Sequence, residues 1–255
     1  MSTVGAAQAA PQANSQDKEP ASSRDVVMSV HSSAIVRAAK LGKTVQGPEG
    51  DLRILGDLDL EVLPGDAVSI RGMSGSGKST LLGLLAGLDQ ATEGEVYLFE
   101  QPLTPLDEDA RAALRAGQVG FVFQSFHLLG GMTAIENVML PLELGGARDA
   151  RERAAALLDR VGLASRRFHY PTQLSGGEQQ RVAIARAFAT GPRVLFADEP
   201  TGNLDLATGQ RIADILHGLR EETGTALVLV THDQQLADRC ERRLLLANGR
   251  LEPLA

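Results

Sequence analysis

The sequence predicts an α/β fold built on a mainly parallel sheet. Short apolar segments with strand character alternate with segments of helical character over much of the 255 residues, which is the pattern of a parallel sheet covered by helices on both faces. A glycine-rich loop also follows one predicted strand and opens a helix, the context in which such loops bind phosphate. The length accommodates one large domain of this kind or two small ones.

The chain divides into a tail and one structured region. Residues 1–33 are rich in Ala, Ser, Gln and Pro and lack apolar periodicity, so we expect a disordered tail there and order over residues 34–255. Residues 125–192 are mainly helical in pattern and are expected to form an inserted helical lobe. The predicted strands are Ile35–Leu41 and Leu52–Val62, as an antiparallel sheet, then Asp66–Arg71, Gly94–Leu98, Val119–Phe123, Arg193–Ala197, Ala226–Val230 and Arg242–Leu246. The predicted helices are Leu81–Leu88, Asp107–Ala116, Arg151–Val161, Ser175–Thr190 and Leu206–Glu222.

Composition excludes several classes of protein. The net charge of -7 argues against nucleic acid as the main partner, and a single cysteine, Cys240, excludes an intramolecular disulfide. No apolar run reaches the ~18 residues that a membrane-spanning helix needs, and the N-terminus lacks the pattern of a signal peptide. We therefore expect a cytoplasmic protein that, if it works at a membrane, depends on another subunit to span it.

The glycine-rich loop matches the pattern G-x-x-x-x-G-K-[ST]. Its glycines let successive backbone N–H groups turn toward phosphate oxygens, and the following helix adds the positive end of its dipole. Lys78 is expected to hold the β- and γ-phosphates of a nucleotide, and Ser79 to offer its hydroxyl to Mg²⁺. The expected nucleotide-binding residues of this segment are Gly72, Met73, Ser74, Gly75, Ser76, Gly77, Lys78, Ser79 and Thr80.

Two acids follow another apolar strand. Asp198 and Glu199 end the run Val194–Ala197, and ligands of parallel α/β sheets bind at the carboxyl ends of strands. Because neighbouring residues at a strand end point in different directions, we expect Asp198 to serve Mg²⁺, through water, while Glu199 activates the attacking water. Without the phosphate loop, the pair would read as an ordinary boundary between a strand and a turn.

The segment Leu174–Glu178 has two compatible readings. Ser175 followed three residues later by Glu178 is a capping box that begins a helix. Gly176 and Gly177 lower helix propensity in the first turn, so a further role is expected: they leave N–H groups open to an approaching phosphate. Ser175 lies 97 residues after Lys78 (175 − 78). The arrangement expected is a two-fold dimer in which each Ser175 faces the γ-phosphate held by the other subunit.

Two single residues complete the candidate site. Gln124 ends a predicted strand at the junction with the helical lobe and is expected to contact Mg²⁺ or the attacking water. His232 follows the apolar run Ala226–Val230, next to the acid pair, where its imidazole would hold the γ-phosphate and orient Glu199. Either residue alone would more often be an unremarkable surface residue.

Together, these motifs resemble the ATP-binding subunits of ABC transporters over Ala34–Leu254. The resemblance identifies the loop as Walker A, Gln124 as the Q-loop, Leu174–Glu178 as the signature motif, Leu195–Glu199 as Walker B, Asn203–Asp205 as the D-loop and His232 as the switch histidine. It implies an ABC ATPase domain of the P-loop NTPase class, with a mainly parallel RecA-like core, an antiparallel β subdomain and the helical lobe. The stretches Phe121–Leu129, Thr133–Val138 and Asp198–Asp205 resemble the group that powers lipoprotein release and macrolide export, and Lys43–Val45, Leu88–Asp89 and Gly120–Phe126 narrow the likeness to one type of subunit within it.

One position departs from the family pattern. The family usually stacks an aromatic ring on adenine near the start of the domain, and this chain has Val45 in that place and no tryptophan. Loss of a stacked ring weakens base binding by ~1 kcal/mol. We therefore expect modest selectivity between ATP and GTP.

The resemblance also implies a mechanism and partners. Two subunits would close around two ATP–Mg²⁺, with Ser175, Gly176, Gly177, Glu178 and Asp205 contacting the nucleotide across the dimer. Hydrolysis through Glu199, His232 and Gln124 would then release the dimer and drive a separate integral membrane permease that docks near Gln124, which places the chain on the cytoplasmic face of the inner membrane. Two alternatives share the same chemistry: a soluble ABC-type ATPase of DNA repair or translation, and an ATPase switch that controls an envelope hydrolase through a membrane partner.

Overall fold

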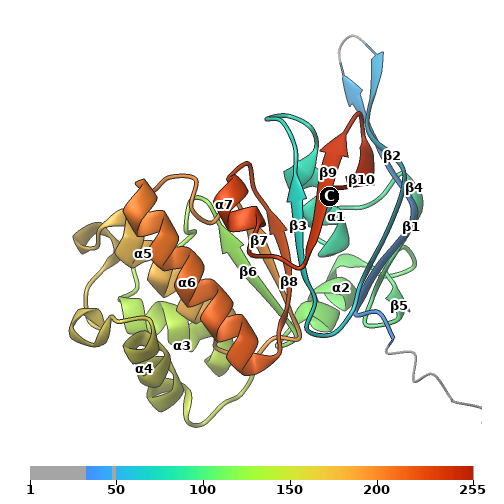
Figure 1. Ribbon diagram of the computed structural model, residues 1–255. Coiled ribbons are helices and arrows are strands. Elements are labelled where there is room, and N and C mark those ends of the chain that lie inside the picture. The colour runs from blue at the N-terminus through green and yellow to red at the C-terminus, as the bar shows by residue number, and fades with distance from the viewer. Residues whose placement is uncertain (1–32, 48–49, 255) are drawn as a thin grey trace, which may run out of the picture. The chain divides into compact units, whose positions relative to one another are not determined.

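Two sheets organise the chain in the computed structural model, which describes residues 33–47 and 50–254. The expectation of a tail over residues 1–33 falls, apart from Ser33, outside the described residues. The larger sheet has the strand order β10–β9–β3–β8–β7–β6, and the smaller has the order β2–β1–β4–β5. Figure 1 shows the larger sheet between a group of helices on one side and the smaller sheet on the other.

The strands of the larger sheet are parallel except at one edge, where β10 pairs antiparallel with β9. The smaller sheet is antiparallel throughout. The larger sheet contains β3 (Ala67–Arg71), β6 (Val119–Phe123), β7 (Val194–Asp198), β8 (Ala226–Val230), β9 (Arg242–Ala247) and β10 (Arg250–Pro253). The smaller contains β1 (Val36–Gly47), β2 (Gly50–Val62), β4 (Glu93–Leu98) and β5 (Gln101–Pro102). The predicted parallel sheet and the predicted antiparallel hairpin are both confirmed.

Five α-helices of the described residues lie close to the predicted ranges, and the α-helices α3 and α7 are additional. The α-helices are α1 (Lys78–Leu85), α2 (Glu108–Arg115), α3 (Ala134–Leu144), α4 (Ala150–Arg160), α5 (Gly176–Phe188), α6 (Leu206–Thr223) and α7 (Gln234–Ala237), and Ala164–Arg166 and Pro171–Gln173 form short 3₁₀ helices. The bounds of α3 were not predicted, although Thr133 and Glu136 form a complete capping box at its start. Pro141 inside α3 obscures the helical pattern, and α7 is too short to show any period.

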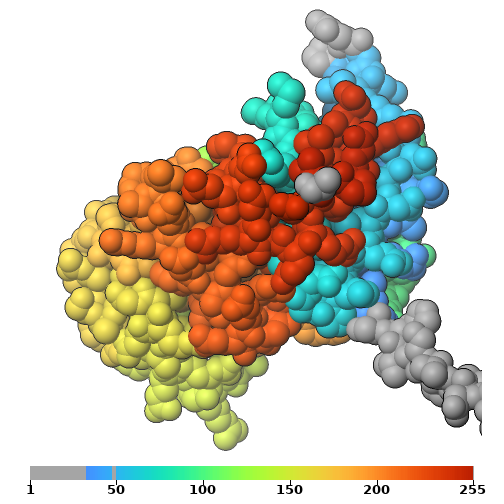
Figure 2. Space-filling view, viewed as in Figure 1, coloured from blue at the N-terminus to red at the C-terminus, as the bar shows by residue number. Residues whose placement is uncertain are grey.

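The larger sheet is buried on both faces, as a parallel sheet requires. Alternate residues of β7 and β8 enter two separate apolar clusters. Leu195 and Leu227 belong to the cluster that includes buried residues of α3–α6, whereas Phe196 and Val228 belong to the cluster that includes α1 and the smaller sheet. Figure 2, in the same view as Figure 1, shows the C-terminal part of the described residues, in red, between the helices and the smaller sheet. Because β3, β8, β7 and β6 run parallel, their carboxyl ends and the polar residues that follow them lie at the same edge of the sheet.

Candidate functional site

The phosphate loop connects β3 to α1 and lines a cavity of about 700 Å³, here called the phosphate cavity. The Lys78 ammonium donates hydrogen bonds to the main-chain oxygens of Gly72 and Met73, at 3.0 Å each. The cavity also receives Gln124, Glu199 and His232 from the ends of three other strands. Its loop residues are Gly72, Met73, Ser74, Gly75, Gly77, Lys78, Ser79 and Thr80. Ser76 is the one predicted loop residue outside this lining, and its hydroxyl oxygen is buried.

Asp198 ends β7 beside the loop, and the hydroxyl of Ser79 lies near its carboxylate. Its Oδ1 is buried and lacks a hydrogen-bond partner among the described residues. Burial raises the pKa of Asp198 above its ordinary value, and the negative charge of Glu199 raises it further, against the contact with Ser79 and the charge of Lys78. An unpaired buried carboxylate oxygen next to a hydroxyl is suited to a hard cation such as Mg²⁺.

We expect Asp198→Asn to stabilise the protein in the absence of nucleotide and Mg²⁺. A raised pKa in the folded state means that ionisation of Asp198 costs stability, and that this cost develops as the pH rises from the unfolded value of 3.8 through the folded value. A neutral isostere removes the cost, so the melting temperature at pH 7.5 should rise by about 2 °C once solvent screening of this half-buried group is considered. The gain should vanish near pH 3.5.

Differential scanning fluorimetry across this pH range measures the effect. Asp51→Asn, at an exposed position of β2, is the matched control and should change little. A lower melting temperature for Asp198→Asn at pH 7.5 would contradict the argument. Added ATP and Mg²⁺ should stabilise the unsubstituted protein more than the variant, because the variant lacks the charged oxygen that the cation needs.

Glu199 is held in an unusual backbone conformation, with φ +46°, immediately after β7. Three groups contact its Oε2: the hydroxyl of Thr231 at 3.1 Å, the backbone N–H of His232 at 3.2 Å and Nδ1 of His232 at 2.9 Å. Non-glycine residues at positive φ cost energy and occur often at functional sites. The expected proximity of the acid pair to His232 is therefore present, and the histidine contacts Glu199 directly.

The signature segment lies outside the phosphate cavity. Ser175 caps α5, its side chain accepting a hydrogen bond from the backbone N–H of Glu178, whose carboxylate in turn accepts from the Ser175 backbone N–H at 2.8 Å. That last hydrogen bond lowers the pKa of Glu178. Asp205 caps α6 by accepting from the N–H of Thr208. Both acids are therefore helix-capping residues in this structure.

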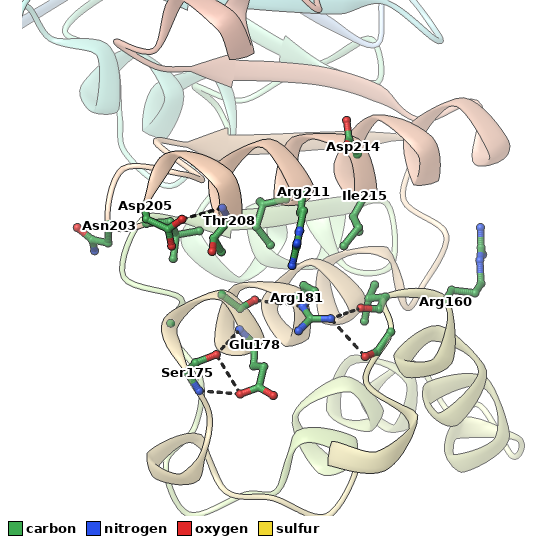
Figure 3. A pocket seen from close by; sticks show the side chains of 16 residues that line it. Arg160, Ser175, Glu178, Arg181, Asn203, Asp205, Thr208, Arg211, Asp214 and Ile215 are labelled. Atoms are coloured by element: carbon green, nitrogen blue, oxygen red, sulfur yellow. Dashed lines mark hydrogen bonds between the residues drawn. The ribbon is translucent and has the colours of Figure 1, made fainter.

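A second cavity of about 730 Å³, the signature cavity, lies between α5 and α6. Figure 3 shows Ser175, Glu178 and Arg181 along α5 and Asp205 and Thr208 along α6. Of the predicted nucleotide-binding residues, Ser175, Gly176, Gly177, Glu178 and Asp205 line it, and none of them lines the phosphate cavity. The structure therefore separates the two halves of the predicted site within one chain.

Gly177 has a packing role that the sequence did not reveal. A Cβ atom at this position would lie 2.5 Å from Cγ2 of Thr208, closer than side chains tolerate. The glycine therefore permits α5 and α6 to approach each other at the signature cavity. The lack of a side chain at Gly177 is therefore required for helix packing, in addition to the predicted phosphate contact.

Leu52 and Ile54 of β2 also line the phosphate cavity. Val45 lies opposite Leu52 in the β1–β2 register and does not itself line the cavity. Leu52 is 62% exposed, which is unusual for a leucine in a sheet. The phosphate cavity thus has an aliphatic part formed by these two residues of β2.

We expect GTP to compete measurably with ATP for this cavity. Aliphatic side chains cover either purine without the ring-stacking preference of an aromatic residue, so the ratio of kcat/KM for ATP to that for GTP should stay below about one hundred, a difference of ~2.7 kcal/mol. Steady-state hydrolysis of the two nucleotides measures it. Leu52→Tyr supplies a ring at a position that lines the cavity and should tighten binding of both nucleotides. A preference for ATP above a hundredfold would refute the expectation.

A third cavity of about 750 Å³, here called the aromatic groove, lies beside the chain segment that follows Gln124. Phe121 and Phe123 are stacked side by side in β6 with ring centroids 5.7 Å apart, and Leu144 at the end of α3 is 81% exposed. Arg186 of α5 donates hydrogen bonds to the main-chain oxygens of Phe126 at 2.9 Å and His127 at 2.6 Å. Burial lowers the pKa of Arg186. The groove is largely apolar, and two arginines, Arg115 and Arg186, contribute to its lining.

Within the described part of the chain, no helix is both long and apolar enough to cross a membrane. The same residues contain no group of three or more His, Cys, Asp or Glu side chains arranged to hold a metal ion.

The chain is similar to known proteins over most of its length. The ABC transporter family profile matches residues 55–202. The chain is 56% identical to the uncharacterized ABC transporter ATP-binding protein YbbA of Escherichia coli strain K12, over 86% of this chain and 96% of that protein. It is 50% identical to the lipoprotein-releasing system ATP-binding protein LolD of Pseudomonas syringae pv. tomato, over 86% and 97%.

Two further comparisons extend the likeness. The macrolide export ATP-binding/permease protein MacB of Syntrophobacter fumaroxidans is 46% identical over 86% of this chain, which corresponds to 31% of that longer protein. The dimeric ATP-binding cassette MJ0796, solved in a post-hydrolysis state with ADP and Pi, superposes with a TM-score of 0.79 at 42% identity, covering 85% of this chain and 96% of the cassette. The subunit type indicated by Lys43–Val45 is that of YbbA.

Proposed function

The chain belongs to the ABC transporter ATP-binding family, and from that premise we propose that two copies close around two ATP molecules to drive a separate integral membrane permease. The fold is that of an ABC ATPase cassette, and the chain is an ATP hydrolase of the transporter type. We assign the cassette to residues 34–255, with a helical lobe over residues 125–192. The permease docking site, the cation and the residue roles below are part of the proposal.

One observation carries the dimer proposal. The phosphate loop and Glu199 share the phosphate cavity, whereas Ser175 and Asp205 line the signature cavity of the same chain. Contacts from a signature segment to a γ-phosphate held by Lys78 would therefore come from a second copy of the chain. The Ser175 hydroxyl and the N–H groups at the start of α5 would contact that phosphate across the two-fold axis.

Mg²⁺ fits the phosphate cavity. Ser79, Asp198 and the Oε1 of Gln124 would hold it together with phosphate oxygens, and the buried unpaired Oδ1 of Asp198 supports that assignment. The cation would neutralise charge that develops on the phosphates during transfer. Glu199 would accept a proton from the attacking water, and His232, which contacts Glu199 and lines the same cavity, would orient it and hold the γ-phosphate.

The permease would dock in the aromatic groove near Gln124. Phe121, Phe123 and Leu144 offer an apolar surface of the kind that receives an amphipathic helix, and Arg186 fixes the segment that follows Gln124. Gln124 lines the phosphate cavity from the end of the strand whose phenylalanines face the groove. This proximity would link permease docking to catalysis, with the chain peripheral on the cytoplasmic face of the inner membrane.

An affinity pull-down of Glu199→Gln protein from native membranes, in mild detergent with ATP and Mg²⁺, tests the proposal. Recovery of a permease with four transmembrane helices, or a multiple of four, and a periplasmic domain would support it, provided that Leu144→Asp abolishes recovery. Leu63→Asp, an exposed leucine outside all three cavities, is the control. Recovery of only soluble proteins or nucleic acid would favour a soluble ABC-type ATPase, and an envelope hydrolase bound to the membrane partner would favour the switch.

A further inference from the structure

The side chains of Gln124 and Asn203 form a reciprocal amide pair. Nε2 of Gln124 donates to Oδ1 of Asn203 at 3.0 Å, and Nδ2 of Asn203 donates to the main-chain oxygen of Gln124 at 3.0 Å. The two residues are 79 positions apart and follow the neighbouring strands β6 and β7. The roles assigned so far to Gln124 do not require this pair.

The pair fixes which end of the Gln124 carboxamide is free. A main-chain carbonyl oxygen can only accept a hydrogen bond, so Asn203 must turn its nitrogen toward it. That orientation leaves the Asn203 oxygen facing Gln124, where it binds the amide nitrogen. The Oε1 of Gln124 is then the free end of the carboxamide. Because the oxygen and the nitrogen of an amide have nearly the same shape, shape alone would not select this orientation.

The choice of end matters for a cation. A carboxamide oxygen ligates Mg²⁺, whereas its NH₂ group carries only donors and repels it. A Gln124 side chain free to rotate would present the wrong end for part of the time. A neighbour that holds the nitrogen removes that competing state before the cation arrives.

The main chain next to Asn203 is shaped around the same side chain. A Cβ atom at Gly202 would lie 2.9 Å from Nε2 and 3.2 Å from Cδ of Gln124. Gly202 has an ordinary backbone conformation, since it is not among the glycines with positive φ. Its lack of a side chain therefore serves the close approach of Gln124, independently of the hydrogen bonds to Asn203.

Asn203 also lies between the two cavities. Gln124 lines the phosphate cavity, whereas Asn203 lines the signature cavity two residues before Asp205. In Figure 3, Asn203 lies beside Asp205 at one end of α6. The residue that orients Gln124 thus belongs to the surface that a second subunit would contact.

We propose that Asn203 is a positioning residue that orients the Gln124 carboxamide with its oxygen toward the cation in the phosphate cavity. The inference rests on the proposed function, because it presumes that Gln124 is a cation ligand. Its distinctive consequence is a loss of cation affinity without a loss of cation-free nucleotide affinity. If Asn203 merely stabilised the loop, its substitution would lower the melting temperature and would not reduce cation affinity alone.

Asn203→Leu removes both hydrogen bonds and keeps the branched shape of the side chain. On the Glu199→Gln background, which prevents turnover, Mn²⁺ replaces Mg²⁺ and its binding to the protein–ATP complex is followed by electron paramagnetic resonance. We expect the apparent Kd for Mn²⁺ to rise about five- to tenfold. The affinity for ATP in EDTA and the melting temperature should stay unchanged. Asn203→Asp keeps an acceptor for Nε2 but sets a charged oxygen against the Gln124 carbonyl, and should weaken Mn²⁺ binding as well.

Two further variants sharpen the test. Gly202→Ala displaces the Gln124 side chain without touching Asn203 and should weaken Mn²⁺ binding similarly. Gln124→Glu carries an oxygen at both ends, so adding Asn203→Leu to it should cost no further Mn²⁺ affinity. The control is Gln210→Leu, which removes another exposed amide pair, with Gln235, from α6 and should have no effect.

The outcomes separate this inference from the proposed function. If Asn203→Leu binds Mn²⁺ within twofold of its parent, or if Gln210→Leu loses as much affinity, then Asn203 does not orient Gln124 and the proposed ATPase mechanism is untouched. If the parent protein binds no Mn²⁺ in the presence of ATP, the cation assignment fails and the inference fails with it. Selective loss of Mn²⁺ affinity in Asn203→Leu, absent in the Gln124→Glu background, is the expected result.

Discussion

Glu199→Gln is expected to slow ATP hydrolysis by about 10²- to 10⁴-fold, the range typical of a lost general base. All three described contacts of the carboxylate go to Oε2, from Thr231 and His232. A glutamine can place its amide oxygen where Oε2 lies and accept the same hydrogen bonds, so the fold should be preserved. The described residues supply no hydrogen bond to Oε1, which is the atom available to take a proton from water.

Binding should survive this substitution. With ATP and Mg²⁺ bound but not hydrolysed, the variant should remain as a dimer, which size-exclusion chromatography with light scattering would detect. The unsubstituted protein should dissociate as it consumes ATP. Glu252→Gln, at an exposed position of β10, is the matched control and should behave as the unsubstituted protein. Turnover by Glu199→Gln at the normal rate would show that another group is the base.

Lys78→Ala is expected to abolish tight ATP binding, with a loss of about 30- to 1,000-fold in affinity. Lys78 is only 8% exposed, and its ammonium donates to two carbonyls of the phosphate loop. Phosphate oxygens would replace those carbonyls as charge-assisted partners, and losing such contacts to two phosphates costs ~2–4 kcal/mol. Calorimetric titration with ATP measures the loss directly.

Two companion variants identify its cause. Lys78→Met keeps most of the side-chain volume, so a loss as large as that of Lys78→Ala would show that the charge matters. Lys40→Gln changes an exposed lysine of β1 whose ammonium pairs with Asp59 and should leave ATP affinity unchanged. Near-normal affinity in Lys78→Ala would mean that the backbone N–H groups of the loop hold the phosphates without the lysine.

Local patterns were sufficient to predict the segments that carry the motifs. The phosphate loop lies between β3 and α1, the acid pair lies at the end of β7, and Ser175 and Glu178 form a complete capping box. In each case the signal is a short run of apolar residues followed by polar residues with a specific local geometry. Such information is contained within about ten consecutive residues.

Contacts between distant segments were not predictable in the same way. Leu52, which lines the phosphate cavity, lies opposite Val45 only through the register of β1 and β2. The packing of Gly177 against Thr208 and the amide pair of Gln124 and Asn203 depend on how strands and helices meet. No periodicity in one segment encodes the identity of a partner that lies tens of residues away.

Helix α5 contributes residues to both the signature cavity and the aromatic groove, which have no lining residue in common. Its first turn carries the Ser175 cap, and Arg186 near its last turn holds the segment beside the aromatic groove. The thirteen residues of α5 form one rigid element of ~20 Å, with Ser175 at one end and Arg186 in the last turn. In the proposed complex, a displacement of the end of α5 beside the aromatic groove would therefore be transmitted to Ser175 at the dimer contact, and by the reciprocity of linked equilibria nucleotide-driven closure would act on the permease in return.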